Sequence, residues 1–383
     1  MANVFTEVTP KLLAQGLLAL RQNCVTPRLV NRSYENLAAQ KGAAINVPIP
    51  SAIAVNDVAP ANYAPTTQDS VPTSAVITLD QWKEAPFYLT DKDILQAMDG
   101  IIPMQASEAV KSLANTIDSY ILGLYKGVWS YGGTAGITPF GDGKTTDINQ
   151  ARKRLNQQLA PLGDRYFLFD PETEAAAAAV PAFQAIYASG DSTAIQTGAV
   201  QNKLGFGWFM DQNVPTHTAG TITTGVIAKA ATAQAVGLST IVGTTAASTG
   251  AVALVVGDII SIAGSTQTYT VTEAVTQGSA ATDFSVKISP PLVKALAGSE
   301  AITVKASHVV NLAFHRDFAA FATRPLEQTG TGFGNHIMSE VDPVSGLSLR
   351  LEITREHKRV RFSYDVLYGA AIVRPQLATR LAG

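Results

Sequence analysis

The feature that most constrains the fold is a strand-like segment near the N-terminus that contains several prolines. Residues 43–80 begin with the strand-like run AINVPIP, and a second continuous strand-like run, AVITLDQWKEAPFYLTD, starts at Ala75 and continues past residue 80. Alternating apolar residues in the first run predict a strand: Ile45, Val47 and Ile49. Pro48 and Pro50 lie in the same run, and proline cannot donate to a strand ladder. We therefore predict a projecting hairpin with open edges over 43–80.

Helices are predicted on both sides of this hairpin. Thr9 and Pro10 are typical of a helix start, and leucines then form one stripe: Leu12, Leu13, Leu17 and Leu20. A long helix is predicted from Pro103 to Gly127, because apolar residues recur at spacings of three and four. It has the length of a spine against which a sheet packs. Residues 25–42 are polar and mixed, and their class stays open.

A mixed region follows the long helix. The patterns predict a helix over 147–159, a strand over 165–169, and a second helix opened by Asp170 and Pro171. The run GFGWFMDQNV predicts another strand over 205–214. The fold class is therefore α+β.

The composition changes between 214 and 308. This segment has eight charged residues in 95, against 50 in the other 288, and is rich in Thr, Ala, Gly and Val. Period-two runs such as DIISIAG, QTYTVTEAV and DFSVKISP predict a small all-β unit. Mixed patterning resumes at Val309, so we interpret 214–308 as an inserted, β-barrel-like domain.

A hairpin is predicted near the C-terminus, from LSLRLEIT and RVRFSYDV around the turn REHK. One face is apolar: Leu349, Leu351, Ile353, Val360, Phe362 and Tyr364. The other face is charged: Arg350, Glu352, Arg359 and Arg361. Basic residues also cluster at this hairpin, interleaved with Glu352, Glu356 and Asp365: Arg355, His357, Lys358, Arg359 and Arg361. This cluster is open to three interpretations, namely a solvated surface, ion pairs between subunits, or contact with phosphate.

Composition and motifs argue against several functions. The formal net charge is -2, whereas backbone binding to nucleic acid needs a basic surplus. No window approaches the length of a membrane-spanning helix, and the N-terminus lacks the basic start of a signal peptide. The segment 136–146 does not have Walker A spacing. The five histidines are scattered in the sequence and Cys24 is the one cysteine. We predict no catalytic, metal or cofactor site, and no enzyme activity.

The order of these parts resembles the major capsid (coat) protein of tailed double-stranded DNA phages, the Hong Kong 97-like fold. The branch that it resembles is the one with an inserted β domain, of the Salmonella podovirus coat-protein type. The stretches that carry this are ANVFTEVTPKLLAQGLLALRQN, AINVPIP, AVITLDQWKEAPFYLTDKDIL, GDIISIAG, TYTVTEAV and FSVKISPPL. The resemblance covers nearly the whole chain.

The resemblance implies a division into domains. It places an N-terminal arm at 1–42, an extended loop at 43–80 and the inserted domain at 214–308. A peripheral domain with the spine helix would combine 81–130 with 331–383. An axial domain would combine 131–213 with 309–330.

The resemblance also implies a function in assembly. Subunits would form hexamers and pentamers of an icosahedral virion shell, made in the host cytoplasm. Implied partners are a separate scaffolding protein, a portal, and packaged double-stranded DNA in weak, non-specific contact, with no membrane. The residues that we expect at subunit contacts are Asn56, Asp57, Tyr63, Gln68, Asp69, Arg350, Glu352, Arg359 and Arg361.

Two departures from relatives refine these expectations. The arm starts at Met1 without a cleavable scaffolding segment, so the scaffold is expected to be a separate protein. The extended loop has no lysine between Ala43 and Asp80, so an isopeptide-crosslinked shell is not expected. The alternatives are a tail or decoration component of the virion, and a soluble enzyme with an unrecognised site.

Overall fold

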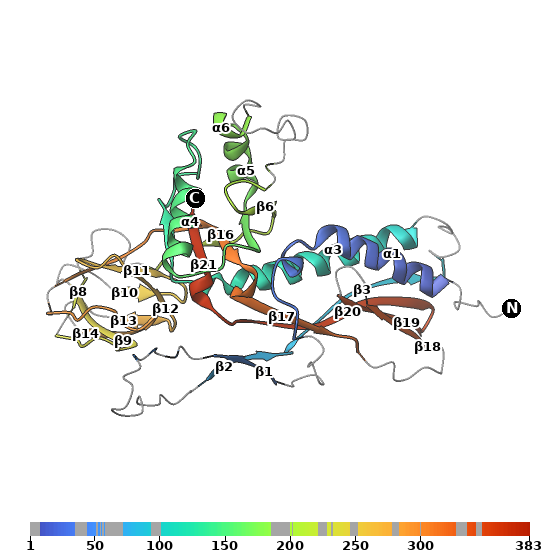
Figure 1. The fold of residues 1–383 in the computed structure, drawn as a ribbon. Coiled ribbons are helices and arrows are strands. Elements are labelled where there is room, and N and C mark those ends of the chain that lie inside the picture. The colour runs from blue at the N-terminus through green and yellow to red at the C-terminus, as the bar shows by residue number, and fades with distance from the viewer. Residues whose placement is uncertain are drawn as a thin grey trace. The chain divides into compact units, whose positions relative to one another are not determined.

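The computed structural model has α+β architecture (Figure 1). It describes residues 8–34, 44–50, 53, 55, 57, 72–92, 101–184, 200, 202–220, 228–230, 233–245, 252–277, 283–298, 300–326, 335–341 and 347–383. The chain divides into two compact units, each assembled from separate segments. Unit 1 consists of Met1–Gln22, Asn31–Leu113 and Ala319–Val373, and unit 2 consists of Asn23–Val30, Ala114–Phe318 and Arg374–Gly383.

Unit 1 contains a five-stranded antiparallel sheet built around the C-terminal hairpin. Its strands are β3 (Gln81–Thr90), β17 (Ala319–Arg324), β18 (Asn335–Val341), β19 (Ser348–Glu356) and β20 (Arg359–Ile372). β20 pairs with β19, β17 and β3, and β18 pairs with β19. The register places Leu351 opposite Tyr364 and Ile353 opposite Phe362, and all four are buried. The predicted hairpin and its apolar face are confirmed.

The base of the proline-bearing segment is a two-stranded ribbon in unit 1. β1 (Ala44–Ile49) pairs with β2 (Thr73–Thr78) and has Pro48 within it, as its open edge allows. One face of the ribbon is buried with β17 and β20 in a cluster: Ile45, Val47, Ile77, Leu79, Ala320, Ala322 and Leu367. A Cβ at Gly369 would lie 2.1 Å from the Thr78 carbonyl oxygen. Only glycine therefore permits β2 to lie this close to β20.

The second strand-like run is not one strand, contrary to what its continuous pattern indicated. Leu79 and Asp80 separate β2 from β3, and the two strands join different sheets. Leu79 is buried with the ribbon, whereas β3 extends along β20. Most of 51–71 lies outside the described residues.

The two predicted apolar helices are present. α1 (Val8–Asn23) buries its predicted leucine stripe: Leu12, Leu13, Leu17 and Leu20. Thr9 lies within α1 and is therefore not the N-cap that the Thr-Pro pair indicated. A Cβ at Gly16 would lie 3.1 Å from side-chain atoms of Leu349 and Tyr364. α1 therefore packs closely on the sheet of unit 1.

The spine helix α3 (Ile101–Leu122) continues as a 3-10 helix, η3 (Gly123–Gly127). The boundary between the two units falls within α3, after Leu113. Within unit 2, Asp118 of α3 is fully buried and accepts hydrogen bonds from the backbone amides of Val25 and Thr26 and from the Thr26 hydroxyl. These bonds fix the segment after α1 to the spine helix.

Unit 2 contains a mixed sheet in the order β4-β21-β16-β5-β6, with β7 also paired to β16. Its strands are β4 (Tyr131–Gly133), β5 (Arg165–Phe169), β6 (Gly207–Met210), β7 (Thr216–His217), β16 (His308–His315) and β21 (Ala378–Ala382). α4 (Thr146–Gln157), α5 (Pro171–Ala178) and α6 (Pro181–Gln184) belong to the same unit. The Asp170 side chain caps α5 as predicted, by accepting from Glu172 and Thr173 amides.

The strand predicted over 205–214 is shorter in the structure. β6 spans Gly207–Met210, between Gly205 at a φ of +80° and a turn in which the Asp211 carboxylate accepts from the Asn213 amide. Asp and Asn favour such local side-chain hydrogen bonds over strand pairing. The predicted strand is therefore present, but the turn at Asp211 and Asn213 ends it at Met210.

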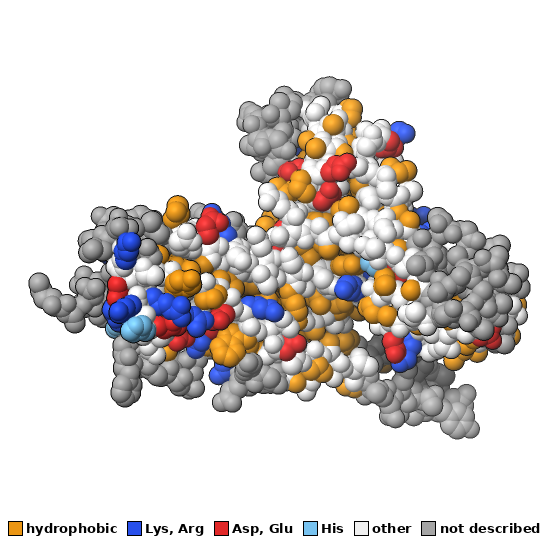
Figure 2. Space-filling model, turned by 180° about the vertical axis from the view of Figure 1, so that it is seen from behind, with side chains coloured by type: hydrophobic (Ala, Val, Ile, Leu, Met, Phe, Trp, Pro, Cys, Tyr) orange, Lys and Arg blue, Asp and Glu red, His pale blue; other side chains and the backbone are white. Residues whose placement is uncertain are grey.

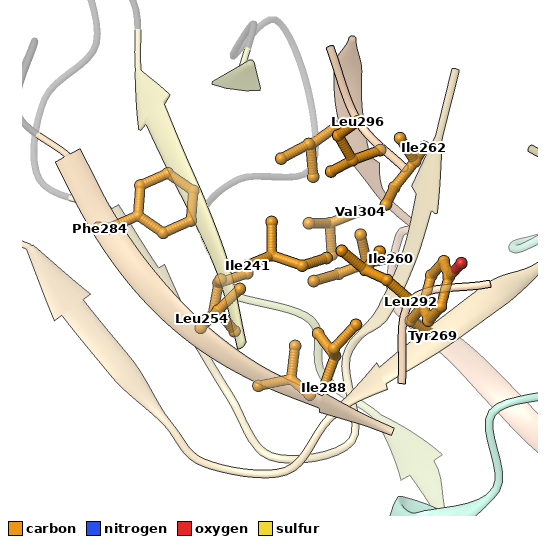
Figure 3. Close-up of a cluster of buried hydrophobic side chains, with 13 residues drawn as sticks. Ile241, Leu254, Ile260, Ile262, Tyr269, Phe284, Ile288, Leu292, Leu296 and Val304 are labelled. Atoms are coloured by element: carbon orange, nitrogen blue, oxygen red, sulfur yellow. The ribbon is translucent and has the colours of Figure 1, made fainter. Parts of the chain in front are cut away.

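The low-charge segment forms a closed six-stranded barrel in the order β11-β12-β14-β9-β8-β15. Its strands are β8 (Ala228–Ala230), β9 (Thr240–Thr245), β11 (Ile259–Ile262), β12 (Thr268–Val271), β14 (Asp283–Ser289) and β15 (Ala301–Val304), beside a small pair formed by β10 (Val252–Leu254) and β13 (Val275–Gln277). Ile241, Ile260 and Tyr269 are among the side chains that point into the barrel core (Figure 3). β7 precedes the barrel strands in the chain and β16 follows them, and these two strands pair with each other.

Candidate functional site

The exposed side of the unit 1 sheet carries the charged residues predicted from the C-terminal hairpin. Register and alternation place aromatic residues from β3 on the same side. We call this the mixed face and define it by Trp82, Glu84, Tyr88, Arg350, Glu352, Arg359 and Arg361. Figure 2 shows positive and negative side chains gathered together over these strands of unit 1, on the left of that view.

Asp365 anchors one end of the mixed face. Its carboxylate accepts from Arg350 Nε at 2.9 Å and Nη2 at 2.5 Å, and from the Trp82 indole at 2.9 Å. The Arg350 guanidinium also lies 5.9 Å from the centre of the Trp82 ring. This bidentate ion pair is largely buried, so it fixes the orientation of both side chains.

The other end of the face is more open. Arg361 donates to Glu84 at 3.0 Å, and the Ser363 hydroxyl donates to the same carboxylate. Arg359 pairs with Glu356 and lies 5.1 Å from the centre of the Tyr88 ring. The Tyr88 side chain is 62% exposed, and Trp82 is 47% exposed. Tryptophan, tyrosine and arginine are the residue types enriched in protein interfaces.

The structure brings together only some of the predicted contact residues. Arg350, Glu352, Arg359 and Arg361 share the mixed face, and Asp57 is exposed. The remaining four predicted residues lie outside the described residues: Asn56, Tyr63, Gln68 and Asp69. Contact with another subunit stays a prediction for all nine. The sequence interpretation missed Trp82, Glu84 and Tyr88, although their period of two in QWKEAPFYLT was a usable signal.

A buried polar network lies in unit 2, where barrel residues meet the strands around them. The Asp258 carboxylate, next to β11, is fully buried and lies 2.9 Å from His217 Nε2. It also accepts from the backbone amides of Gly220 and Val255. The Tyr125 hydroxyl lies 3.0 Å from His217 Nδ1. In the neutral imidazole, Nε2 donates to Asp258 and Nδ1 accepts from Tyr125.

Arg380 of β21 is the second part of this network. Its guanidinium is fully buried, donates to the Gly257 carbonyl at 2.7 Å, and lies 4.9 Å from the centre of the Tyr125 ring. Burial lowers the pKa of Arg380 to about 9, and Tyr125 and Asp258 oppose that shift. The guanidinium therefore keeps its charge at neutral pH while it holds barrel residues against β21.

Further hydrogen bonds join the barrel to the rest of unit 2. The Thr270 hydroxyl donates to the Lys126 carbonyl, and the Thr268 hydroxyl donates to the Trp129 carbonyl at 2.7 Å. Ile259 packs with Tyr131 and Ala382 in a small apolar cluster. The barrel is therefore attached to η3, β4 and β21 by hydrogen bonds as well as by apolar contact.

The structure brings together two histidines that are scattered in the sequence. β7 and β16 place the rings of His217 and His308 5.4 Å apart. Burial lowers the pKa of His308 to about 4, despite a hydrogen bond of Nδ1 to the Ala306 carbonyl. Histidine and aspartate also pair in hydrolases. In this protein the side chains of His217 and Asp258 are almost completely buried. A substrate therefore has no access to them, and the arrangement supports the fold.

Neither a metal-binding cluster nor a membrane-spanning helix is present in the part of the chain that the structure describes. No cluster of three or more His, Cys, Asp or Glu residues there is arranged to hold a metal ion. None of the helices there combines the length and the hydropathy needed to cross a membrane.

Comparisons with known proteins identify the fold. No protein-family model matches the chain, and no curated protein matches it. A solved structure from Mycobacterium phage Che8 is 15% identical and has a TM-score of 0.54, with 94% of this chain and 90% of that chain covered. The capsid structure of the cyanophage P-SCSP1u is 12% identical and has a TM-score of 0.53, with 94% and 88% covered.

The chain therefore has the fold of a phage capsid protein. It is the Hong Kong 97-like fold, and the resemblance to phage major capsid proteins seen in the sequence is confirmed at this level. The predicted domain boundaries, including those of the inserted domain, stay predictions.

Proposed function

We propose that this chain is a major capsid protein, whose hexamers and pentamers close an icosahedral phage shell around double-stranded DNA. The observation that carries the proposal is the likeness of fold over 94% of the chain to the cyanophage capsid structure. A shell subunit acts by binding its neighbours, so no catalytic site is required. In this proposal the protein resides in the virion after assembly in the host cytoplasm.

The mixed face supports the proposal as a contact between subunits. Its ion pairs are formed within one subunit, but the exposed pairs are individually weak and hydrated. Such charges adapt to a neighbour more readily than buried ones, and the two exposed aromatic rings offer area to bury. We propose that Arg350, Glu352, Arg359 and Arg361 act at this contact, together with the extended-loop residues Asn56, Asp57, Tyr63, Gln68 and Asp69.

The proposed domains follow the resemblance. The arm (1–42) and the extended loop (43–80) would reach neighbouring subunits. The peripheral domain (81–130 and 331–383) and the axial domain (131–213 and 309–330) would form the wall, with the inserted domain (214–308) attached to the axial domain. Many weak, repeated contacts are sufficient to close a stable shell.

The proposed partners are further copies of this chain, a separate scaffolding protein and a portal. Near-neutral charge suits weak, non-specific contact with packaged DNA, because a strongly basic wall would retain the DNA by counterion release. The loop without lysine supports a shell without covalent crosslinks. Ladders on denaturing gels of mature particles would contradict that part of the proposal.

Electron microscopy tests the function directly. The protein is expressed with and without a candidate scaffolding protein, and we expect closed icosahedral shells in the first sample. Tail-like or decorating assemblies would favour another virion component. Deletion of residues 51–74 is expected to leave soluble protein and to abolish shells, because the loop would no longer reach a neighbour.

Matched substitutions test the mixed face. Tyr88→Ser should reduce the yield of shells by about tenfold, because an interface aromatic contributes on the order of 1–2 kcal/mol to each contact. Ile137→Ser is the control, since Ile137 in unit 2 is equally exposed at 62%. Equal yields from Tyr88→Ser and the unchanged protein, with normal thermal stability, would remove the mixed face from the assembly contacts.

A further inference from the structure

Unit 2 contains a polar cavity of about 610 Å³ between α4 and the turn that joins β11 to β12. This volume lies within the usual range for small-ligand sites. Its lining consists of amides, hydroxyls, two cationic side chains and one indole: Trp129, Gln150, Lys153, Arg154, Gln157, Gln158, Thr266, Gln267 and Thr268. No carboxylate is among these lining residues, so the cavity has a positive charge.

Arg154 is the residue that points most clearly to a ligand. Its guanidinium is half-buried, and it makes no hydrogen bond or ion pair with the residues that the structure describes. Burial alone lowers its pKa. Arg165 in the same unit shows the usual arrangement, because its guanidinium donates to the carbonyls of Ala160 and Pro161 and to the side chain of Asn156. A partly desolvated guanidinium without such acceptors is suited to bind an anion.

Two more lining residues restrict the ligand further. The Gln158 Oε1 atom is buried and has no hydrogen-bond partner among the described residues, so it is suited to accept from a donor on the ligand. Trp129 is half-buried and forms no aromatic pair within the described part of the chain. An indole beside cationic side chains is the combination that binds a base and its phosphate together.

We propose that this cavity binds a nucleotide, with its phosphate on Lys153 and Arg154 and its base against Trp129. The lining amides would then complete the hydrogen bonds of the phosphate and of the sugar or base. A simple carboxylate or inorganic anion would use the two cations but would leave Gln158 and Trp129 without a role. This inference does not depend on the proposed shell function, because every residue that carries it lies in unit 2 of one chain.

The test uses the full, unassembled chain and isothermal titration with three probes: deoxyadenosine monophosphate, inorganic phosphate and deoxyadenosine. We expect the monophosphate to bind most tightly of the three. Arg154→Gln should weaken its binding by about tenfold or more, the usual effect of losing one charge-assisted contact. Arg152→Gln is the matched control, because Arg152 is exposed on the same helix and is absent from the lining. It should leave the affinity unchanged.

Trp129→Leu separates the two halves of the site. It should weaken binding of the monophosphate and leave binding of inorganic phosphate unchanged. A thermal melt of each variant checks folding, and Lys153→Gln replaces Arg154→Gln if the latter unfolds. Oligothymidylate with and without a 5′-phosphate distinguishes a strand end from a free nucleotide as the source.

The proposal is overturned if deoxyadenosine monophosphate shows no binding at millimolar concentration. It is equally overturned if Arg152→Gln and Arg154→Gln weaken binding to the same extent. Equal affinity for inorganic phosphate and the monophosphate, with no effect of Trp129→Leu, would also overturn it.

Discussion

The mixed face of unit 1 and the buried polar network of unit 2 contain the same kinds of side chain in opposite surroundings. On the mixed face, Arg361 and Glu84 pair while both remain about half exposed. In the network, His217 and Asp258 pair at almost the same distance with no exposure of Asp258. Water competes for the first pair and has no access to the second.

This difference shows how burial decides what a polar contact does. An exposed pair is worth little by itself because solvent and salt screen it, so its partners remain available to a neighbouring molecule. A buried pair costs desolvation free energy when it forms, yet loss of one partner leaves the other unsatisfied. Exposed pairs therefore suit contacts between subunits, and buried pairs hold separate segments of one chain together.

The largest expected effect comes from breaking the buried network. Asp258→Ala should lower the free energy of unfolding by about 3–5 kcal/mol, because His217 and two backbone amides lose their acceptor in a dry site. Urea denaturation measures the loss. Glu273→Ala, which removes the exposed partner of Lys287, is the control and should cost less than about 1 kcal/mol. Equal losses would show that the network does not stabilise the fold.

The next effect concerns pH, because two buried groups in unit 2 shift in opposite senses. Burial lowers the pKa of His308 to about 4, so the unfolded chain binds more protons between pH 4 and 6.5 and stability is lost as pH falls through this window. Burial raises the pKa of Asp118 to about 7, opposed by its bonds to Thr26 and Val25. The folded chain therefore binds more protons between pH 3.8 and 7, and stability is lost as pH rises there.

Single substitutions separate these opposing slopes, each at most about 1.4 kcal/mol per pH unit. In His308→Gln the remaining Asp118 contribution should make stability decrease from pH 4 to 6.5. In Asp118→Asn the remaining His308 contribution should make stability increase over the same window. Urea midpoints at several pH values measure both. Slopes of the same sign in the two variants would contradict the assignment.

The smallest expected effect is at the exposed pair. Arg361→Ala and Glu84→Ala should each change the free energy of unfolding by under about 1 kcal/mol, with a coupling of roughly 0.5 kcal/mol in the double variant. The coupling should disappear in high salt. A coupling above about 2 kcal/mol would mean that this part of the mixed face is already fixed within the subunit, and would weaken its assignment to assembly.

Expression of residues 214–308 alone tests whether the barrel needs the buried polar network of unit 2 in order to fold. The barrel has its own closed sheet and its own core. We expect this fragment to fold when it is expressed alone, because the buried network attaches the barrel and does not form its core. Dispersed amide signals in an NMR spectrum would support this. A random-coil spectrum would show that the barrel needs the contacts of Arg380 and Tyr125 to fold.

Local patterns were sufficient to predict most of the elements. The leucine stripe of α1, the Asp170 cap of α5 and the alternation in β19 and β20 are each contained in a few consecutive residues. The break at Leu79 and Asp80 was missed because both sides of it have the same strand-like period. Only the tertiary structure shows that Leu79 belongs to the ribbon cluster.

The polar network was not predictable in the same way. Tyr125, His217, Asp258 and Arg380 belong to four separate segments, and none of the four lies in a local motif. The histidines were considered scattered because strand pairing between β7 and β16 is not visible in the sequence. The charged half of the mixed face was predicted from one hairpin, whereas its aromatic half comes from β3, which pairs with β20 across most of the chain.

The pairing of the first and last barrel strands has a consequence for the order of folding. β8 and β15 lie side by side, so a folded barrel holds the two ends of its own chain together. Without it, joining β7 to β16 would mean closing a loop of roughly 90 residues, at an entropic cost of about 4 kcal/mol. A barrel that folds first leaves only 218–227 and 305–307 to be closed between these strands, which lowers that cost by about 1.7 kcal/mol. Refolding of the central sheet should therefore be slow when the barrel is destabilised, even in variants whose sheet residues are unchanged.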